Sequence, residues 1–297
     1  MAEATTHLSE FREAKELVQV VADAFEAHSH LYSKCNALHK DVNDNTILIH
    51  AATGRGVLVD WDQVNEENEI GQPTSSGKQV EEEVSPLYRT GAWYFMSGGL
   101  LDDHYHGAHT LQDDFESFFH VLLYYALKCL KNNQTEDQIE EIWREIFEES
   151  RYDCSRGRYT GGWGKKLMFL QHWKFKNPLV LTDNEALERW FCKAWAAFYQ
   201  YSDWRVNAAR AKAYTRSDRF RDLFREPVPF DSLALHDHGY LRELFMTTLA
   251  KDSWSQKRKD ASAARDSQPY LSKIPHNRED SDDEDAPARK RSKTAAF

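Results

Sequence analysis

The sequence predicts a mainly α-helical chain that carries one small β-hairpin. Apolar residues recur at helical spacing over residues 9–34 and again in several segments between 135 and 254. Residues 115–130 are apolar almost all round, which is typical of a helix buried in a core. Only residues 46–49 and 57–59 have the β-branched and aliphatic character of short strands. With 41% hydrophobic and 13% aromatic residues, the chain has ample material for a core.

The first helix is expected over residues 9–34, with Ser9 as its N-cap. Its apolar residues fall on one helical face: Phe11, Ala14, Leu17, Val18, Val21, Ala24, Phe25 and Leu31. This face predicts an amphipathic helix that packs on the core.

The hairpin that follows places two acids at one end. Asp41 precedes the first strand and Asp60 follows the second, with a turn-forming segment at 51–55 between the strands. One carboxylate of such a pair can orient or deprotonate a hydroxyl, while the other holds a metal ion bound to phosphate. This arrangement permits phosphate-transfer chemistry, and the plain alternative is a pair of solvated surface acids.

The motifs around these acids resemble those of protein kinases. The run His39-Lys40-Asp41, with Thr46 five residues later, is similar to the H-R-D-x-x-x-x-N catalytic loop, and Asp60-Trp61-Asp62 is similar to D-F-G. The runs RTGAWYFMS at 89–97 and DDFESFFHVLL at 113–123 resemble the fungal-type protein kinase family in particular. The resemblance is close over about residues 9–130 and looser beyond.

This resemblance implies the C-terminal lobe of a protein kinase over residues 1–254, without an N-terminal β lobe, and an activation segment at about 60–99. The implied cofactors are ATP and Mg²⁺, and the implied partner is a protein substrate or another protein. The implied site residues are the catalytic Asp41 with His39 and Lys40, the metal ligand Asp60, Asn45 or Thr46 as a cofactor ligand, Asp114 supporting the catalytic loop, and Arg89, Thr90 and Gly91 ending the segment.

Several departures from the family pattern point to weak activity. Thr46 stands where the family has the asparagine that binds a second magnesium, and Gly99 stands where a glutamate anchors the activation segment. No lysine occupies the context that holds the α and β phosphates. We therefore expect the chain alone to transfer phosphate at no useful rate. An exposed apolar face near the hairpin, where the absent lobe would dock, predicts self-association.

Three functions remain open at this point. The first is a fungal-type serine/threonine kinase, truncated or inactive as this chain. The second is a pseudokinase that acts as an interaction scaffold. The third is a small-molecule phosphotransferase of the aminoglycoside or choline kinase type, which also uses H-x-D and D-W-[DE] motifs. The run at 89–97 favours the first two.

The rest of the chain is predicted to be helical up to Trp254. Residues after Asp62 up to about 86 are polar and aperiodic, which predicts a mobile loop. The best later helices are 139–147, 165–173, 184–201 and 241–249. Trp190, Phe191, Trp195 and Phe198 recur at helical spacing, which indicates core packing and not a cofactor site.

Charge and composition limit the binding partners and the cellular location of the protein. A net charge of -10 argues against a general nucleic-acid-binding surface, and no segment is long and apolar enough for a membrane span. The four widely spaced cysteines fit a reduced intracellular protein, nuclear or cytoplasmic. Residues 255–297 are predicted to form a disordered charged tail, and the basic cluster at 289–293 resembles a nuclear localisation signal.

Overall fold

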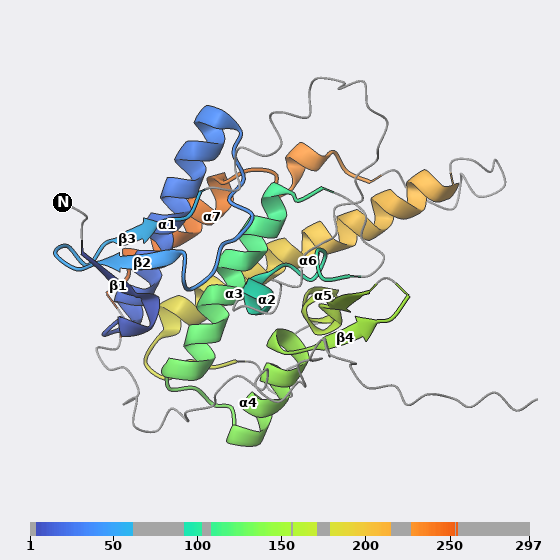
Figure 1. Cartoon of the computed structure of the whole chain (residues 1–297). Helices are drawn as coiled ribbons and strands as arrows, with labels where there is room; N and C mark the ends of the chain where they lie inside the picture. The colour runs from blue at the N-terminus through green and yellow to red at the C-terminus, as the bar shows by residue number, and fades with distance from the viewer. Residues whose placement is uncertain are drawn as a thin grey trace, which may run out of the picture. The chain divides into compact units, whose positions relative to one another are not determined.

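The computed structural model describes residues 4–61, 92–102, 108–155, 157–170, 179–214, 227–252 and 254. The described residues form a mainly helical structure with two small antiparallel sheets, as the sequence predicts in outline (Figure 1). The predicted tail at 255–297 and the basic cluster within it lie outside the described residues. No helix in the described ranges is long and apolar enough to cross a membrane.

The first sheet has three strands in the order β1-β2-β3, where the sequence predicts two. The predicted hairpin is present as β2, Ile47–His50, and β3, Gly56–Leu58, with Leu48 opposite Val57. The additional strand β1, Thr5–His7, pairs antiparallel with β2 and places Thr6 opposite Ile49. Three residues are too few for a period-2 pattern to be recognised, so sequence reasoning missed this strand.

A second hairpin, β4 and β5, was also not predicted. β4, Ser150–Asp153, pairs with β5, Arg158–Gly161, in full antiparallel register. Most of its residues are polar and exposed or only partly buried, so no apolar alternation marks these strands in the sequence.

Helix α1 runs over Ala14–Cys35, five residues later than its predicted start. The prediction of Ser9 as N-cap was wrong, because residues Leu8–Glu10 form a separate 3₁₀ turn and Glu13 occupies the cap position. At the other end, Asn36 adopts a left-handed conformation with φ of 51° and donates its backbone N–H to the Tyr32 carbonyl. Asparagine tolerates this conformation better than most residues, which explains why the helix stops there.

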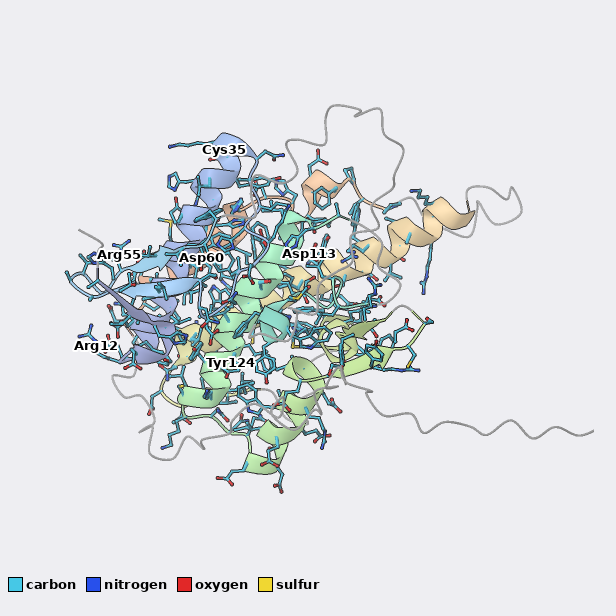
Figure 2. All side chains as sticks on the ribbon, in the orientation of Figure 1. Arg12, Cys35, Arg55, Asp60, Asp113 and Tyr124 are labelled. Atoms are coloured by element: carbon cyan, nitrogen blue, oxygen red, sulfur yellow. The ribbon has the colours of Figure 1, made fainter. Side chains whose placement is uncertain are left out.

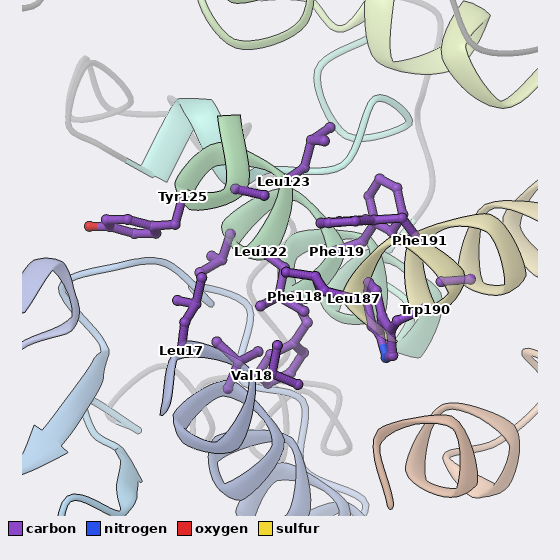
Figure 3. Close-up of a cluster of buried hydrophobic side chains, with 14 of the residues drawn as sticks. Leu17, Val18, Phe118, Phe119, Leu122, Leu123, Tyr125, Leu187, Trp190 and Phe191 are labelled. Atoms are coloured by element: carbon purple, nitrogen blue, oxygen red, sulfur yellow. The ribbon is translucent and has the colours of Figure 1, made fainter. Parts of the chain in front are cut away.

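Helix α3, Leu111–Cys129, is the centre of the core. Every residue of α3 is buried except Glu116, Tyr124 and Lys128, which confirms the prediction of a central buried helix. Figure 3 shows its apolar side chains between Leu17 and Val18 of α1 on one side and Leu187, Trp190 and Phe191 on the other. Thr110 and Asp113 form a reciprocal capping box at its start.

The short helix α2, Ala92–Phe95, was not predicted. The remaining helices follow the predicted pattern with shifted ends. They are α4, Glu136–Ile142, which continues into a π-helical turn over Trp143–Phe147; α5, Trp163–Leu170; α6, Glu185–Tyr214; and α7, Gly239–Leu249. Helix α6 extends well past the predicted end at 201. The expectation for its aromatic residues holds, because Trp190, Phe191 and Phe198 are fully buried and Trp195 is partly buried against the core.

Candidate active site

The loop between α1 and β2 carries the predicted catalytic residues. His39 is fully buried, whereas Lys40 and Asp41 are partly buried. Lys40 has a φ of 66° and Asp60 a φ of 63°, so both motifs contain a non-glycine residue in the left-handed region. Such backbone conformations cost free energy and occur where the surrounding structure enforces them, often at functional sites.

The Asp114 carboxylate holds this loop in place from the first turns of α3. Its Oδ2 accepts a hydrogen bond from the His39 backbone N–H at 2.9 Å, and its Oδ1 accepts one from the Lys40 N–H at 3.1 Å. The same carboxylate lies 2.8 Å from His109 Nε2 and 2.9 Å from His28 Nε2. Asp114 is completely buried, and Thr110 is the N-cap of the helix, so Asp114 does not serve as a cap.

The buried Asp114 carboxylate is ionised. Burial alone would raise the pKa of Asp114, but hydrogen bonds from His109 and His28 outweigh it and hold the pKa below its usual range. Burial lowers the pKa of His238 to about 3, so this imidazole is neutral and its Nε2 can donate to His28 Nδ1 at 2.9 Å. The carboxylate therefore fixes α1, α3, α7 and the loop through one network.

The His39 side chain connects the loop to the second motif. Its Nε2 lies 2.8 Å from the Val59 carbonyl, and its Nδ1 accepts the Asp41 backbone N–H at 3.3 Å. Burial lowers the pKa of His39, which fits a neutral imidazole with the proton on Nε2. Because Val59 directly precedes Asp60, this bond places Asp41 and Asp60 at the same end of the hairpin.

Asn43 is a site residue that sequence reasoning missed. Its side-chain Nδ2 donates to the Asp41 carboxylate Oδ1 at 2.7 Å and to the Asp41 carbonyl at 3.1 Å. Its Oδ1 accepts the Asn45 backbone N–H at 2.7 Å, which is an Asx turn. An asparagine two positions after a catalytic acid was the available signal, since this residue type commonly bonds to its own loop.

Thr46 and Asn45, the predicted cofactor ligands, face different environments. The Thr46 hydroxyl is buried, donates to the Asp41 carbonyl at 2.9 Å and accepts the Asn43 N–H at 3.0 Å. It holds the loop together and is not presented to a metal. Asn45 is exposed on the turn. Neither residue supplies a buried oxygen beside Asp60.

Asp60 is exposed at the end of β3, beside the sheet (Figure 2). Its carboxylate has no hydrogen bond or ion pair within the described residues, so its oxygens are open to a cation. Trp61 packs edge-on against His39 with ring centroids 4.6 Å apart and donates its indole N–H to the Leu58 carbonyl at 3.0 Å. Across the described ranges, no group of three or more His, Cys, Asp or Glu side chains forms a metal cage. A single carboxylate would need further oxygens, such as those of a bound phosphate, to complete a Mg²⁺ site.

The predicted end of the activation segment is only partly visible. Arg89, Thr90 and Gly91 lie outside the described residues, as does Asp62. The described part of the predicted segment begins again with α2 at Ala92 and ends at Gly99, before α3.

Comparison with protein family models matches residues 1–126 to the family described as fungal protein kinase. The match spans α1, the first sheet, both motifs and most of α3. Over this part, the chain is similar to fungal protein kinases, as its motifs indicate. No curated protein and no solved structure matches the chain.

Proposed function

We propose that residues 1–254 form the C-terminal lobe of a fungal-type serine/threonine protein kinase domain. Members of that family transfer the γ-phosphate of ATP to protein hydroxyls, and we propose that this chain alone is a truncated form with at most a very low rate of transfer. The observation that carries this proposal is the Asp114 carboxylate, which holds the His39 and Lys40 backbone amides 2.9 and 3.1 Å away. A fully buried carboxylate that binds two backbone amides of a strained loop costs free energy, and this cost is understandable if the loop does chemistry.

In this proposal, Asp41 orients or deprotonates the acceptor hydroxyl. Asn43 fixes its carboxylate through the 2.7 Å hydrogen bond to Oδ1, so the other oxygen can face the substrate. Asp60 would hold Mg²⁺, which neutralises phosphate charge when bound. His39 holds Asp41 and Asp60 at the same end of the hairpin through its hydrogen bond to the Val59 carbonyl.

The low rate follows from the loop itself. The hydroxyl of Thr46 donates to the Asp41 carbonyl and accepts the Asn43 backbone N–H. It therefore does not replace the asparagine that binds a second magnesium in the family. Phosphate transfer depends mainly on positioning and charge neutralisation. The loss of one electrostatic contact of this kind costs about 100-fold or more in rate.

The second candidate function is a pseudokinase scaffold. The hydrogen bonds of the Thr46 hydroxyl to the Asp41 and Asn43 carbonyls favour this function. They stabilise the loop, and they also keep the hydroxyl from binding a metal. A small-molecule phosphotransferase is the third candidate, and the match to fungal protein kinases supports it least. The first two differ in whether Asp41 and Asp60 act on bound ATP.

The partners and location of the protein are also proposals. We propose protein substrates or partners and a nuclear or cytoplasmic location. We also propose self-association through an apolar face near the β2–β3 hairpin. The exposed large hydrophobic side chains of the described residues are Tyr152, Trp163, Leu170, Val180, Tyr199, Val228 and Met246.

Transfer of radiolabelled phosphate from ATP to casein in the presence of Mg²⁺ tests the proposed function. We expect slow transfer that falls to background in Asp41→Asn, while Asp153→Asn, a change in the distant β4–β5 hairpin, leaves it intact. Transfer that is the same in Asp41→Asn would refute the assignment. No transfer by the unmodified chain, with ATP still bound, would select the scaffold function.

A further inference from the structure

We propose that Lys165 is a positioning residue that fixes the end of the activation segment, where the family pattern places a glutamate and this chain has Gly99. The inference rests on the proposed function for the meaning of the segment. The anchoring itself rests on contacts of Lys165 with residues that precede α3.

Lys165 lies in α5 and is completely buried. Its ammonium Nζ lies 3.2 Å from the Trp93 carbonyl, 2.8 Å from the Tyr94 carbonyl and 2.6 Å from the Met96 carbonyl. The last carbonyls of a helix have no partner within the helix, and a lysine ammonium has three N–H donors. Lys165 therefore caps the C-terminal end of α2 with all of its hydrogen bonds.

The residues after α2 are fastened by acids of α3. The Ser97 hydroxyl donates to Asp113 Oδ1 at 2.5 Å, and the Gly98 backbone N–H donates to Glu116 Oε1 at 2.7 Å. Burial lowers the pKa of Lys165 to about 7, although the charge of Glu116 opposes this shift. The segment from Ala92 to Leu101 is thus held between α3 and α5 by charged groups.

The backbone of the segment also lies directly against α5. A Cβ atom on Gly98 would lie 3.0 Å from the Lys165 Cβ and 2.9 Å from the Gly162 carbonyl oxygen. Only glycine allows this approach, so the segment and the start of α5 interlock at Gly98 and Gly162. The short distance lets the lysine side chain reach back to the carbonyls of α2.

A buried lysine between α5 and the segment is energetically unfavourable if it serves only for packing. Burying an ammonium costs free energy that a methionine of similar length would avoid, unless its hydrogen bonds are needed. All three acceptors of Lys165 belong to α2 and the residue that follows it, Met96, so its removal would take one donor away from each of three carbonyls of this one segment. Its role is therefore local to the segment.

The functional consequence concerns protein substrates. A segment that is already ordered loses less conformational entropy when a polypeptide binds against it. Lys165 should therefore affect the KM for a protein substrate and leave ATP binding at Asp60 unchanged.

Hydrogen–deuterium exchange of the full chain tests the anchor, with Lys165→Met and Lys165→Gln as variants. Gln retains two N–H donors, so it should have the smaller effect. We expect amide exchange at residues 97–102 to accelerate at least about tenfold in Lys165→Met, corresponding to about one lost hydrogen bond. Exchange in the core of α1 should not change. Lys128→Met, which removes an exposed lysine of α3, is the matched control.

Unchanged exchange at 97–102 would overturn the proposal. So would equal acceleration in α1, because Lys165 would then support the whole fold, and so would failure of both variants to fold. A parallel assay with casein should show a raised KM in Lys165→Met and an unchanged kcat. Absence of transfer by the unmodified chain would count against the proposed function alone, since the exchange result stands without it.

Discussion

The backbone N–H of His39 donates to the carboxylate of Asp114 at 2.9 Å, across 75 residues of sequence. This bond joins the first turns of the central helix to the loop that carries Asp41. Because Asp114 also accepts from Lys40, His28 and His109, its charge is shared among four donors in a fully buried site. The loop geometry depends on that one carboxylate.

Replacing Asp114 by asparagine should destabilise the protein strongly. Asn keeps the shape but turns an NH₂ group toward two donors and removes the charge that His109 faces. We expect a loss of about 3 kcal/mol or more in the free energy of unfolding, as for other broken buried pairs. Urea denaturation measures it, with Asp231→Asn on an exposed 3₁₀ turn as the control. A loss equal to the control would show that Asp114 does not hold the loop.

The ion pair between His109 and Asp114 should make stability depend on pH. Burial lowers the pKa of His109, but the hydrogen bond and charge of Asp114 outweigh it and raise the pKa above 6.5. A raised pKa in the folded state stabilises the protein fully below pH 6.5, and this stabilisation is lost as the pH rises through the folded value. The free-energy difference between wild type and His109→Gln should be largest near pH 6 and fall toward pH 9. A constant difference would rule out the pair.

Lys165 should have the opposite pH dependence. Burial lowers its pKa to about 7, against the opposing effects of Glu116 and Glu149, and His120 lies nearby on α3. A depressed lysine pKa means that the unfolded chain binds more protons between pH 7 and 10.5, so stability rises over that range. The stability of wild type relative to Lys165→Met should rise by up to about 1.4 kcal/mol per pH unit above pH 7. A flat difference between pH 7 and 9 would contradict a buried, titrating lysine.

The hydroxyl of Thr46 should matter for stability. Thr46→Val keeps the shape but removes the donor to the Asp41 carbonyl and the acceptor for the Asn43 N–H. We expect a loss of about 1 to 3 kcal/mol, because buried polar groups of the loop are left unpaired. Thr53→Val in the exposed turn before β3 is the control and should cost less. Equal effects would mean that the Thr46 hydroxyl is free to serve as a ligand.

Asn43 should influence transfer but not metal binding. Without its bond to Oδ1, the Asp41 carboxylate can rotate away from the acceptor hydroxyl. General acid–base groups typically contribute about 10² to 10⁴ in rate, so Asn43→Ala should lower transfer at least about tenfold. Binding of metal and ATP should be unchanged, because the side-chain hydrogen bonds of Asn43 are to Asp41, Asn45 and Thr46 and not to Asp60. A loss of both together would indicate a collapsed loop.

Much of this architecture could be predicted because it depends on local patterns. The apolar surface of α3 and the aliphatic strands around Asp41 and Asp60 are visible in the sequence itself. The anchors could not be predicted in the same way. Lys165 reaches residues 69 to 72 positions earlier, and His28 meets His238 across 210 positions. Such contacts between polar residues leave no periodic signal, and strand β1 is too short to leave one.

The binding of Mn²⁺ with ATP, followed by electron paramagnetic resonance, tests the central claim most directly. Mn²⁺ replaces Mg²⁺ at oxygen ligands. Because ATP itself chelates Mn²⁺, binding to the protein is measured as the change in signal relative to Mn²⁺ and ATP without protein. The account predicts ATP-dependent Mn²⁺ binding that weakens at least about tenfold in Asp60→Asn, as expected when a charged ligand is lost, and persists in Asp153→Asn. Binding that is equally strong in Asp60→Asn, or no ATP-dependent binding by the unmodified chain, would contradict a kinase-type site at the end of β3.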